Sequence, residues 1–263
     1  MSKIHTFVVL AYKESKYLED CIRSVLNQKY NSDVVIATST PNDYIKKLAK
    51  KYNLKIFVNK NKKGIGYDFD FAVDCGKTEL VTVAHQDDIY NYEYSDLIVK
   101  SYKSHSDSLI LFSDYYEIKN GKEVHKNGNL KIKRILMLPL RSSKISGNRF
   151  VKRLVLSFGN PICCPAVTFV KEKTGAKVFE SDMKCDVDWL AWERLSIKKG
   201  KFIYIKDHLM GHRVHEDSTT SEILNDNKRS IEDFQMFKKF WPTFIAKLLT
   251  RLYKNSEKSN DVK

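Results

Sequence analysis

Residues 6–26 set the architecture of the chain and read TFVVLAYKESKYLEDCIRSVL. The first five residues are an apolar, β-branched run that is typical of a buried strand. The segment after them changes to a helical period, because its apolar positions fall on one stripe with charged residues between them. The stripe consists of Leu18, Cys21, Ile22, Val25 and Leu26, and Ser15 is the expected N-cap. A strand followed directly by a helix is the first half of a βαβ unit, whose strands pair in parallel.

The same alternation continues through the first 115 residues. Strand-like runs lie at 6–10, 34–38, 55–58, 80–84 and 109–113, and helix-period segments separate them. The pattern predicts an α/β fold with a mostly parallel sheet flanked by helices. After Asn120 the regularity stops and we expect a loop-rich basic stretch. The remaining predicted elements are strand 166–170, helix 188–198, strand 202–205 and loop 211–220.

Composition limits the classes of protein to which the chain can belong. With 263 residues, 42% of them hydrophobic, the chain is long and apolar enough for one well-buried domain and too apolar for a disordered protein. No apolar run approaches the roughly 20 residues of a membrane-spanning helix, and the first residues do not read as a signal peptide. We therefore expect a cytoplasmic protein. The five cysteines include no Cys-x-x-Cys pair, which favours reduced thiols over disulfides or structural zinc.

Positive charge is concentrated in one segment. The net charge is +14, and residues 119–153 alone carry eleven Lys or Arg against the single acid Glu123, a local balance of 11 − 1 = +10. Such a balance indicates an anionic partner. The segment contains the apolar run 135–140, which is consistent with a protein resting on an anionic membrane surface and equally with a core element flanked by solvated cations.

The C-terminal segment repeats this combination of apolar and basic residues. Aromatic and aliphatic residues recur at helical spacing from Phe237 to Leu252 with lysines and arginines between them, and Pro242 is expected to kink or restart the helix. We predict a basic amphipathic helical tail. Packing onto the main domain and contact with a membrane interface remain alternatives for it.

An acidic pair follows the strand-like run 80–84. His85 and Gln86 lead into Asp87 and Asp88, which would lie at the carboxyl edge of the sheet, where ligands bind in folds of this class. Adjacent carboxylates repel one another unless a cation lies between them, and oxygen ligands of this kind suit Mn²⁺ or Mg²⁺. The alternative interpretation is a helix N-cap with a solvated neighbour.

Four motifs in order along the chain resemble those of family 2 glycosyltransferases with the GT-A fold. They are the opening strand, turn and helix (7–28), His85-Gln86-Asp87-Asp88 in the place of the metal motif, Asp186-Val187-Asp188-Trp189-Leu190-Ala191-Trp192 in the place of the base motif, and His212-Arg213-Val214-His215 in the place of a basic loop. The resemblance covers about residues 4–220. It implies a GT-A domain at 1–222, with a nucleotide-sugar half at 1–118 and an acceptor half at 119–222, and a tail at 223–263.

The resemblance also implies roles for individual residues. Asp188 would be the general base, with Asp186 as the backup, although Asp188 also suits a helix N-cap. Asp88, Asp87 and His215 would hold the divalent metal. Residues expected to contact the nucleotide-sugar donor are Ala11, Tyr12, Glu14, Thr38, Ser39, Asp70, Gln86, Asp87 and Arg213, and the hydroxyls of Ser218, Thr219 and Thr220 are expected to assist.

Three departures from the family pattern qualify these roles. Thr38 and Ser39 stand where many members carry an acid that reads the uracil base, so the donor base remains open between uridine and thymidine. His85 replaces the first acid of the metal motif. The usual arginine is missing from 64–72, so that Lys63 or Arg213 would have to meet the diphosphate.

The resemblance therefore implies an inverting transfer of a sugar from a UDP- or dTDP-linked donor to a glycan hydroxyl. The positive charge suggests a lipid-linked acceptor in bacterial surface polysaccharide synthesis, and a protein peripheral to the inner face of the cell membrane. Two alternatives stay open. A nucleotidyltransferase should carry a Gly-rich, basic turn after the first strand, which this chain lacks. A non-catalytic basic module would bind membrane or nucleic acid, but the basic cluster lacks the interleaved aromatic residues of a single-strand binder, so no nucleic-acid partner is expected.

Overall fold

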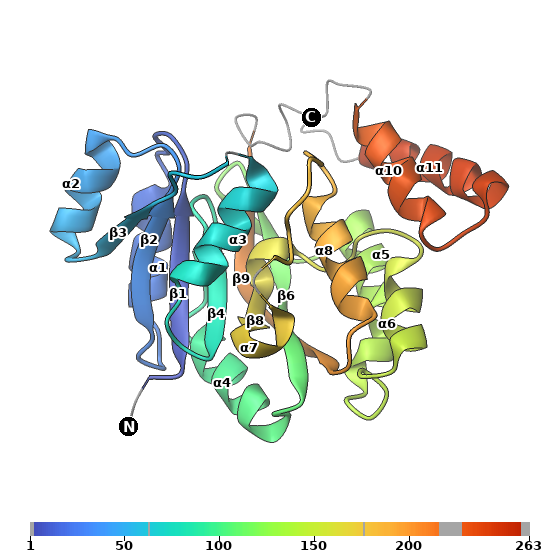
Figure 1. The fold of residues 1–263 in the computed structure, drawn as a ribbon, viewed down its shortest axis with the longest axis horizontal. Helices are drawn as coiled ribbons and strands as arrows, with labels where there is room; N and C mark the ends of the chain where they lie inside the picture. The colour runs from blue at the N-terminus through green and yellow to red at the C-terminus, as the bar shows by residue number, and fades with distance from the viewer. Residues whose placement is uncertain (1–2, 63, 176, 216–227, 259–263) are drawn as a thin grey trace.

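One mixed sheet forms the centre of the protein in the computed structural model, which describes residues 3–62, 64–175, 177–215 and 228–258 (Figure 1). Within these residues the sheet has nine strands in the order β3-β2-β1-β4-β8-β6-β9-β5, and β7 pairs with β6. The strands are β1 (His5–Ala11), β2 (Asp33–Thr38), β3 (Lys55–Val58), β4 (Leu80–His85), β5 (Ile89–Tyr90), β6 (Ser108–Lys119), β7 (Lys122–Val124), β8 (Val167–Val170) and β9 (Lys201–Val214). Strands β1 to β4 are parallel to one another, and β9 is parallel to β6. The predicted α/β fold is confirmed, with β8 antiparallel to both of its neighbours.

Helices cover both faces of the sheet, because successive side chains of each central strand enter two different cores. In β1, Val8 belongs to one core and its neighbours Phe7 and Val9 belong to the other. The helices are α1 (Leu18–Leu26), α2 (Asp43–Lys51), α3 (Ile65–Cys75), α4 (Tyr94–Ser104), α5 (Gly128–Leu136), α6 (Arg149–Leu156), α7 (Lys171–Thr174), α8 (Val187–Ser196), α10 (Lys228–Lys238) and α11 (Thr243–Lys258), with the 3-10 turns η1 (Leu138–Arg141) and η2 (Cys164–Ala166). Helices α1, α2 and α4 close the core of Phe7, and α3, α6 and α8 close that of Val8. Burial on both faces explains why these strands are continuous apolar runs.

The basic stretch after Asn120 is helical, which corrects the expected loop. It forms α5, η1 and α6, and an asparagine caps each of the two α-helices. The side chain of Asn127 accepts a hydrogen bond from the Leu130 N–H, and that of Asn148 accepts from the N–H groups of Phe150 and Val151. Three short helical pieces therefore lie where the sequence suggested irregular chain.

Two further boundaries differ from the predictions. β9 continues to Val214 because it pairs with β6 along its length, so that the chain at 211–214 is strand rather than loop. The predicted hydroxyls at 218–220, the cation Lys63 and the boundary at 222 lie outside the described residues. The N-cap of α1 is Tyr17 instead of Ser15, whose side chain contacts Asp87.

The tail helices α10 and α11 pack onto the sheet domain, with Pro242 between them. Met236, Phe237 and Ala246 are fully buried, and the ring of Phe237 meets that of Trp189 in α8 edge to face at 5.0 Å. In the described part of the chain, no helix combines the length and hydropathy needed to cross a membrane. All five cysteines are free thiols.

Candidate functional site

The carboxyl ends of β1, β2, β4 and β9 lie at one edge of the sheet, and most of the predicted site residues follow these ends. Ala11 ends β1, and the exposed residues Tyr12 and Glu14 follow it. The side chain of Gln86 binds both backbone groups of Tyr12, at 2.9 and 3.0 Å. The Lys13 N–H donates to the hydroxyl of Thr40, from the loop after β2, at 2.6 Å. The turn after β1 is therefore fixed to the loops on both sides of it.

Asp88 is buried and held from β9. One oxygen, Oδ1, accepts hydrogen bonds from His212 Nδ1 at 3.0 Å and from the Arg213 N–H at 2.9 Å. The other, Oδ2, is buried and has no hydrogen-bond partner among the described residues. Burial by itself would raise the pKa of Asp88, but the charge and hydrogen bond of His212, with the Arg213 N–H, lower it overall. Asp88 is thus an ionised carboxylate with one oxygen available.

Asp87 lies beside the same end of β9. It accepts a hydrogen bond from Ser15 Oγ at 2.7 Å, and His215 Nε2 lies 3.5 Å from its Oδ2. The Arg213 guanidinium donates to the Asp87 backbone carbonyl at 2.9 Å and covers the ring of Tyr17 at 4.2 Å. The predicted residues Asp87, Asp88, Arg213 and His215 are therefore brought together.

The metal-binding capacity of this cluster is incomplete by itself. Among the described residues, no three His, Cys, Asp or Glu side chains are grouped so that they would hold a metal ion alone. The available donors are nevertheless of the right kind, because Asp88 Oδ2 lacks a partner and so does the buried Nε2 of His85. Burial also lowers the pKa of His85, which favours the neutral imidazole that metals bind. The residues present fit a divalent cation that takes its remaining ligands from a substrate phosphate.

Asp188 lies in the first turn of α8, and its carboxylate is fixed by Asn160. The amide Nδ2 of Asn160 donates to Asp188 Oδ2 at 2.8 Å, and the Trp189 N–H donates to Oδ1 at 2.8 Å. Burial raises the pKa of Asp188, while these two hydrogen bonds and the charge of Lys133 counteract part of the rise. The helix N-cap is Asp186 rather than Asp188.

Asp186 has a different environment from Asp188. It is buried, and burial together with the nearby Asp233 of α10 raises its pKa well above the ordinary value. Glu232, also in α10, accepts hydrogen bonds from the N–H groups of Lys184, Cys185 and Asp186. The tail helix α10 therefore fixes the segment that leads into the Asp188 turn.

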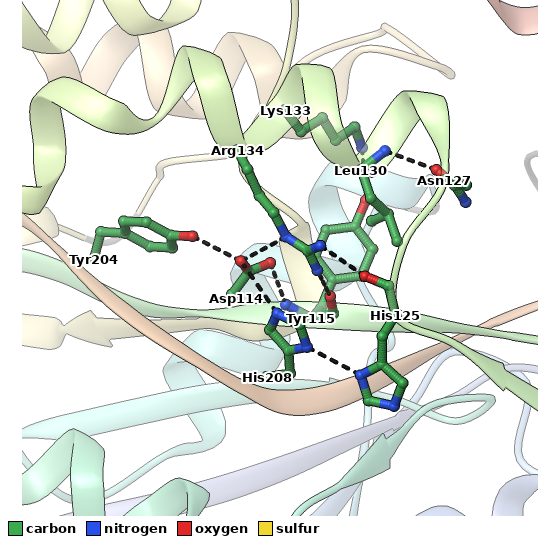
Figure 2. A network of polar contacts seen from close by, with 9 residues as sticks. All are labelled: Asp114, Tyr115, His125, Asn127, Leu130, Lys133, Arg134, Tyr204 and His208. Atoms are coloured by element: carbon green, nitrogen blue, oxygen red, sulfur yellow. Dashed lines mark hydrogen bonds and ion pairs between the residues drawn. The ribbon is translucent and has the colours of Figure 1, made fainter.

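Lys133 of α5 contributes a cation that the motif analysis did not include. Its ammonium donates to the hydroxyl of Tyr115 at 3.0 Å, and the Tyr115 ring lies edge to face with that of His212, the partner of Asp88. Arg134 positions the helix, because it donates to the buried Asp114 at 2.8 Å and to the carbonyls of Tyr115 and His125 (Figure 2). The positive charge of Lys133 also acts to lower the pKa values of both Asp188 and His212.

The carboxylate of Asp68, in α3, lies at the end of β2. Ser39 donates to Asp68 of α3 at 2.8 Å, and Asn59, which is tied to the carbonyl of Thr38, donates to Asp68 at 2.7 Å. Asp70 does not join this group, because its carboxylate accepts the N–H groups of residues 178 and 179. Asp68 therefore places a carboxylate at the end of β2, where the sequence itself has Thr38 and Ser39 instead of an acid.

His212, Lys133 and Asp68 are the residues that sequence reasoning missed at this edge. His212 belongs to the basic motif, but only the register of β9 shows that it reaches Asp88. Lys133 was one of eleven cations in the segment 119–153. Asp68 had a usable signal, because it lies on the first turn of a helix that follows the third strand.

Comparison with known proteins places this arrangement in a family context. Residues 6–173 match the family model described as Glycosyl transferase family 2. A search of curated proteins by sequence gives no match.

Two solved structures are similar in fold to this chain. The structure titled S. aureus TarS 1-349 in complex with UDP-GlcNAc has 18% sequence identity and a TM-score of 0.62, with 91% of this chain and 71% of that chain covered. The mannosyltransferase PcManGT from Pyrobaculum calidifontis, in complex with GDP-Man and Mn2+, has 14% identity and a TM-score of 0.66, with 95% and 70% covered. At these identities the likeness establishes the GT-A type of fold.

Proposed function

Since the chain belongs to glycosyl transferase family 2, we propose that it transfers a sugar from a nucleoside diphosphate sugar to a hydroxyl of a glycan acceptor, with inversion. The observation that carries this proposal is the contrast between two carboxylates, Asp88 at the carboxyl edge of the sheet and Asp188 in the first turn of α8, both of which raise the pKa values of the Cys163 and Cys164 thiols. Asp88 is kept ionised and has a free oxygen, whereas burial raises the pKa of Asp188. One suits a metal and the other suits proton transfer. Neither a nucleotidyltransferase nor a non-catalytic module requires this pair.

The donor base would lie at the end of β2. Asp68 and Ser39 present a carboxylate and a hydroxyl there, whereas Thr38 is buried and its hydroxyl accepts the Thr40 N–H. A carboxylate can accept the imide N–H of uracil or thymine. A UDP- or dTDP-linked donor is therefore proposed. Ala11, Tyr12, Glu14 and Gln86 would line its nucleoside, on the turn that Gln86 fixes. Asp70 would act indirectly, by holding residues 178 and 179 against α3.

A divalent cation, Mn²⁺ or Mg²⁺, would be held by Asp88 Oδ2 with Asp87 and His215 nearby. Bound there, it would neutralise charge on the donor diphosphate. Two further cations, Arg213 bound to the Asp87 carbonyl and Lys133 bound to Tyr115, would compensate for the arginine absent from 64–72.

Asp188 would act as the general base. Its carboxylate takes the proton of the acceptor hydroxyl while the acceptor oxygen bonds to the anomeric carbon. The bond from that carbon to the diphosphate oxygen breaks on the opposite face, so the configuration inverts and the nucleoside diphosphate leaves with the electron pair. Asp186 is the weaker candidate, because it is buried beside Asp233.

The acceptor would be a lipid-linked glycan of bacterial surface polysaccharide synthesis, at the inner face of the cell membrane. Two features support this class: the positive charge of residues 119–153 and the position of Asn160 and Asp188 beside α6 and the tail. The charge suits an anionic lipid diphosphate.

Calorimetric titration with UDP, dTDP and GDP, each with Mn²⁺ or with chelator, tests the proposal. We expect metal-dependent binding of UDP or dTDP, and loss of that dependence in Asp88→Asn. In Asp188→Asn the donor should still bind, while turnover falls by about 10²–10⁴-fold. Absence of nucleotide binding under every condition would overturn the proposed function, and wild-type turnover in Asp188→Asn would overturn the base assignment.

A further inference from the structure

Exposed hydrophobic side chains are concentrated in one part of the molecule. Ten of the sixteen large hydrophobic residues that are exposed in the described chain lie on α5, η1, α6 and α11 or the loops beside them, which shows that their exposure is not scattered. These ten are Ile132, Ile135, Leu138, Ile145, Phe150, Leu154, Phe158, Phe244, Leu248 and Leu252.

Two of these helices carry their exposed residues as regular stripes. Phe150, Leu154 and Phe158 are spaced by four residues along and just past α6, and Phe244, Leu248 and Leu252 have the same spacing in α11. The two phenylalanines that begin the stripes are 71% and 74% exposed. The opposite sides of both helices enter the core, through Val155 and Leu156 in α6 and Ala246 in α11. Each helix therefore has a second apolar face that is largely exposed to solvent.

The two stripes belong to adjoining elements. Trp241, just before α11, donates its indole N–H to the carbonyl of Ser157 at 2.7 Å, and its ring contacts that of Phe158 at 5.3 Å. Gly159 abuts the ring of Tyr253 in α11. Helices α5, α6 and α11 lie at the same end of the molecule (Figure 1).

The segments that carry the stripes are strongly basic. Residues 124–171 contain ten Lys or Arg and no acid, and residues 234–256 contain five and no acid. The cations that are exposed beside the stripes are Lys131, Arg141, Lys144, Arg149, Lys247, Arg251 and Lys254. A groove of about 490 Å³ on α5 and η1 is both basic and apolar. It is lined by the cations Lys126, Lys131, Arg134 and Arg141 and by the hydrophobic residues Ile135 and Leu138. A second protein surface would need matching acids, whereas an anionic bilayer offers negative head groups and an apolar interior together.

We propose that the exposed faces of α5, α6 and α11 form a docking surface for an anionic lipid bilayer. The phenylalanines and leucines of the stripes enter the interfacial region, and the flanking lysines and arginines bind lipid phosphates. Phe158 lies two residues before Asn160, the hydrogen-bond partner of Asp188, so docking brings the acceptor side of the site to the head groups. That link to the acceptor rests on the proposed function, but binding to the bilayer does not.

Vesicle flotation with the full chain tests the docking surface without donor or acceptor. The two probes are vesicles of phosphatidylcholine alone and of phosphatidylcholine mixed with phosphatidylglycerol. We expect the wild type to float with the anionic vesicles only, and added salt to weaken the binding. The double variant Phe244→Glu/Leu248→Glu should bind at least about tenfold less. The matched control Leu26→Glu alters an exposed leucine at the end of α1, against the other core, and should bind like the wild type.

Three results would overturn the docking surface. One is wild-type protein that stays unbound with anionic vesicles, and another is a double variant that binds as well as the wild type. The third is a stable dimer, seen by light scattering, that the same substitutions dissociate while vesicles remain unbound, because the surface would then cover a second copy. Charge reversal with Lys247→Glu/Arg251→Glu, at two exposed positions of α11, repeats the test should the first variant fold poorly. Loss of nucleotide binding would leave the flotation result unchanged and would count against the proposed function alone.

Discussion

Asn160 is, after the Trp189 N–H, the second hydrogen-bond donor that favours the charged form of Asp188. Its amide donates to the carboxylate at 2.8 Å and so favours the ionised form, against the burial that raises the pKa of Asp188. A base with a raised pKa loses activity, as the pH falls, at a higher pH than an ordinary carboxyl group does.

Removing this hydrogen bond with Asn160→Ala should raise the pKa of Asp188 further. The acidic limb of the kcat/KM profile would then move to higher pH by about one to two units, since loss of a hydrogen bond to a charged group costs about 1.5–3 kcal/mol and a pH unit corresponds to 1.36 kcal/mol. The profile is measured for both proteins from pH 4.5 to 9. A limb that stays in place would mean that Asp188 does not take the proton.

A substitution at Lys133 tests whether this cation takes part in the reaction. Replacing it with Met keeps the length of the side chain and removes the charge beside Tyr115 and His212. We expect kcat to fall by about 10²-fold, because charge that develops on the leaving diphosphate loses one stabilising cation. Lys103→Met is the matched control, since Lys103 is exposed on α4, a helix that packs against the other core. Equal rates in the two variants would remove Lys133 from the reaction.

The candidate site residues that directly follow a strand could be predicted from the sequence. Those that reach the site only through the tertiary fold could not. Asp87 and Asp88 could be located because an apolar strand ends just before them. His212 and Lys133 could not, because their positions depend on the register of β9 against β6 and on the Arg134 contact with Asp114. Neither of these is a local property of the sequence.

Helix α10 connects the tail to the base motif through two acids. Glu232 binds three backbone N–H groups of residues 184–186, and burial raises the pKa of Asp233 to about 6. In the unfolded chain the pKa of an aspartate is about 3.9, so between about pH 4 and 6 the folded state binds more protons than the unfolded one. This acid therefore costs stability progressively as the pH rises through that window, and the cost is complete above pH 6.

Asp233→Asn removes this titration. We expect the stability of the variant, relative to that of the wild type, to be higher at pH 8 than at pH 5 by about 1–1.5 kcal/mol, which raises its relative melting temperature. Thermal unfolding followed by circular dichroism at both pH values gives the comparison. A difference between the two proteins that is independent of pH would show that Asp233 ionises as readily in the folded chain as in the unfolded one.

Regular helices and strands were predictable from their periods, whereas the elements between residues 120 and 161 were not. Lysines and arginines occupy both faces of α5 and α6, which obscures the apolar stripe, and four large hydrophobic residues of these helices point to solvent. The caps were the overlooked signal. Asn127 and Asn148 each precede a helix, and both accept N–H groups of its first turn.

The two halves of the sheet are locked together where α3 meets the segment before α8. A Cβ at Gly66 would lie 2.4 Å from the carbonyl oxygen of Phe179 and 3.3 Å from Val187, while Asp70 binds the same segment from one turn further along. Glycine is required here by the closeness of the backbone.

Gly66→Ala should therefore destabilise the protein by about 1–3 kcal/mol, through overpacking that the held segment cannot relieve. Gly128→Ala is the matched control, because nothing lies within 4 Å of its Cβ position in α5, and alanine in a helix is favoured by about 0.5–1 kcal/mol. Urea unfolding midpoints compare the two with the wild type. A midpoint for Gly66→Ala at or above that of the wild type would contradict the packing argument.

The parallel arrangement of β1 to β4 could be predicted from the sequence, but the order of the strands in the whole sheet could not. β1 to β4 follow one another as βαβ units, but β8 takes the position beside β4 that a regular series would have given to β6. Nothing in the short run 166–170 specifies a partner, because its apolar residues suit any central position. The placement of β8 is settled by the whole chain.

The antiparallel placement of β8 has a consequence for synthesis on the ribosome. The edge of β4 that ends at His85 is covered only when Val167 and its neighbours arrive, 167 − 85 = 82 residues later. At about 5–20 residues per second, a nascent chain carries this apolar edge unpaired for about 4–16 s. Unpaired strand edges are where chains pair with one another. Slow translation between residues 85 and 167 would therefore lengthen the time for which the first four strands carry an open edge.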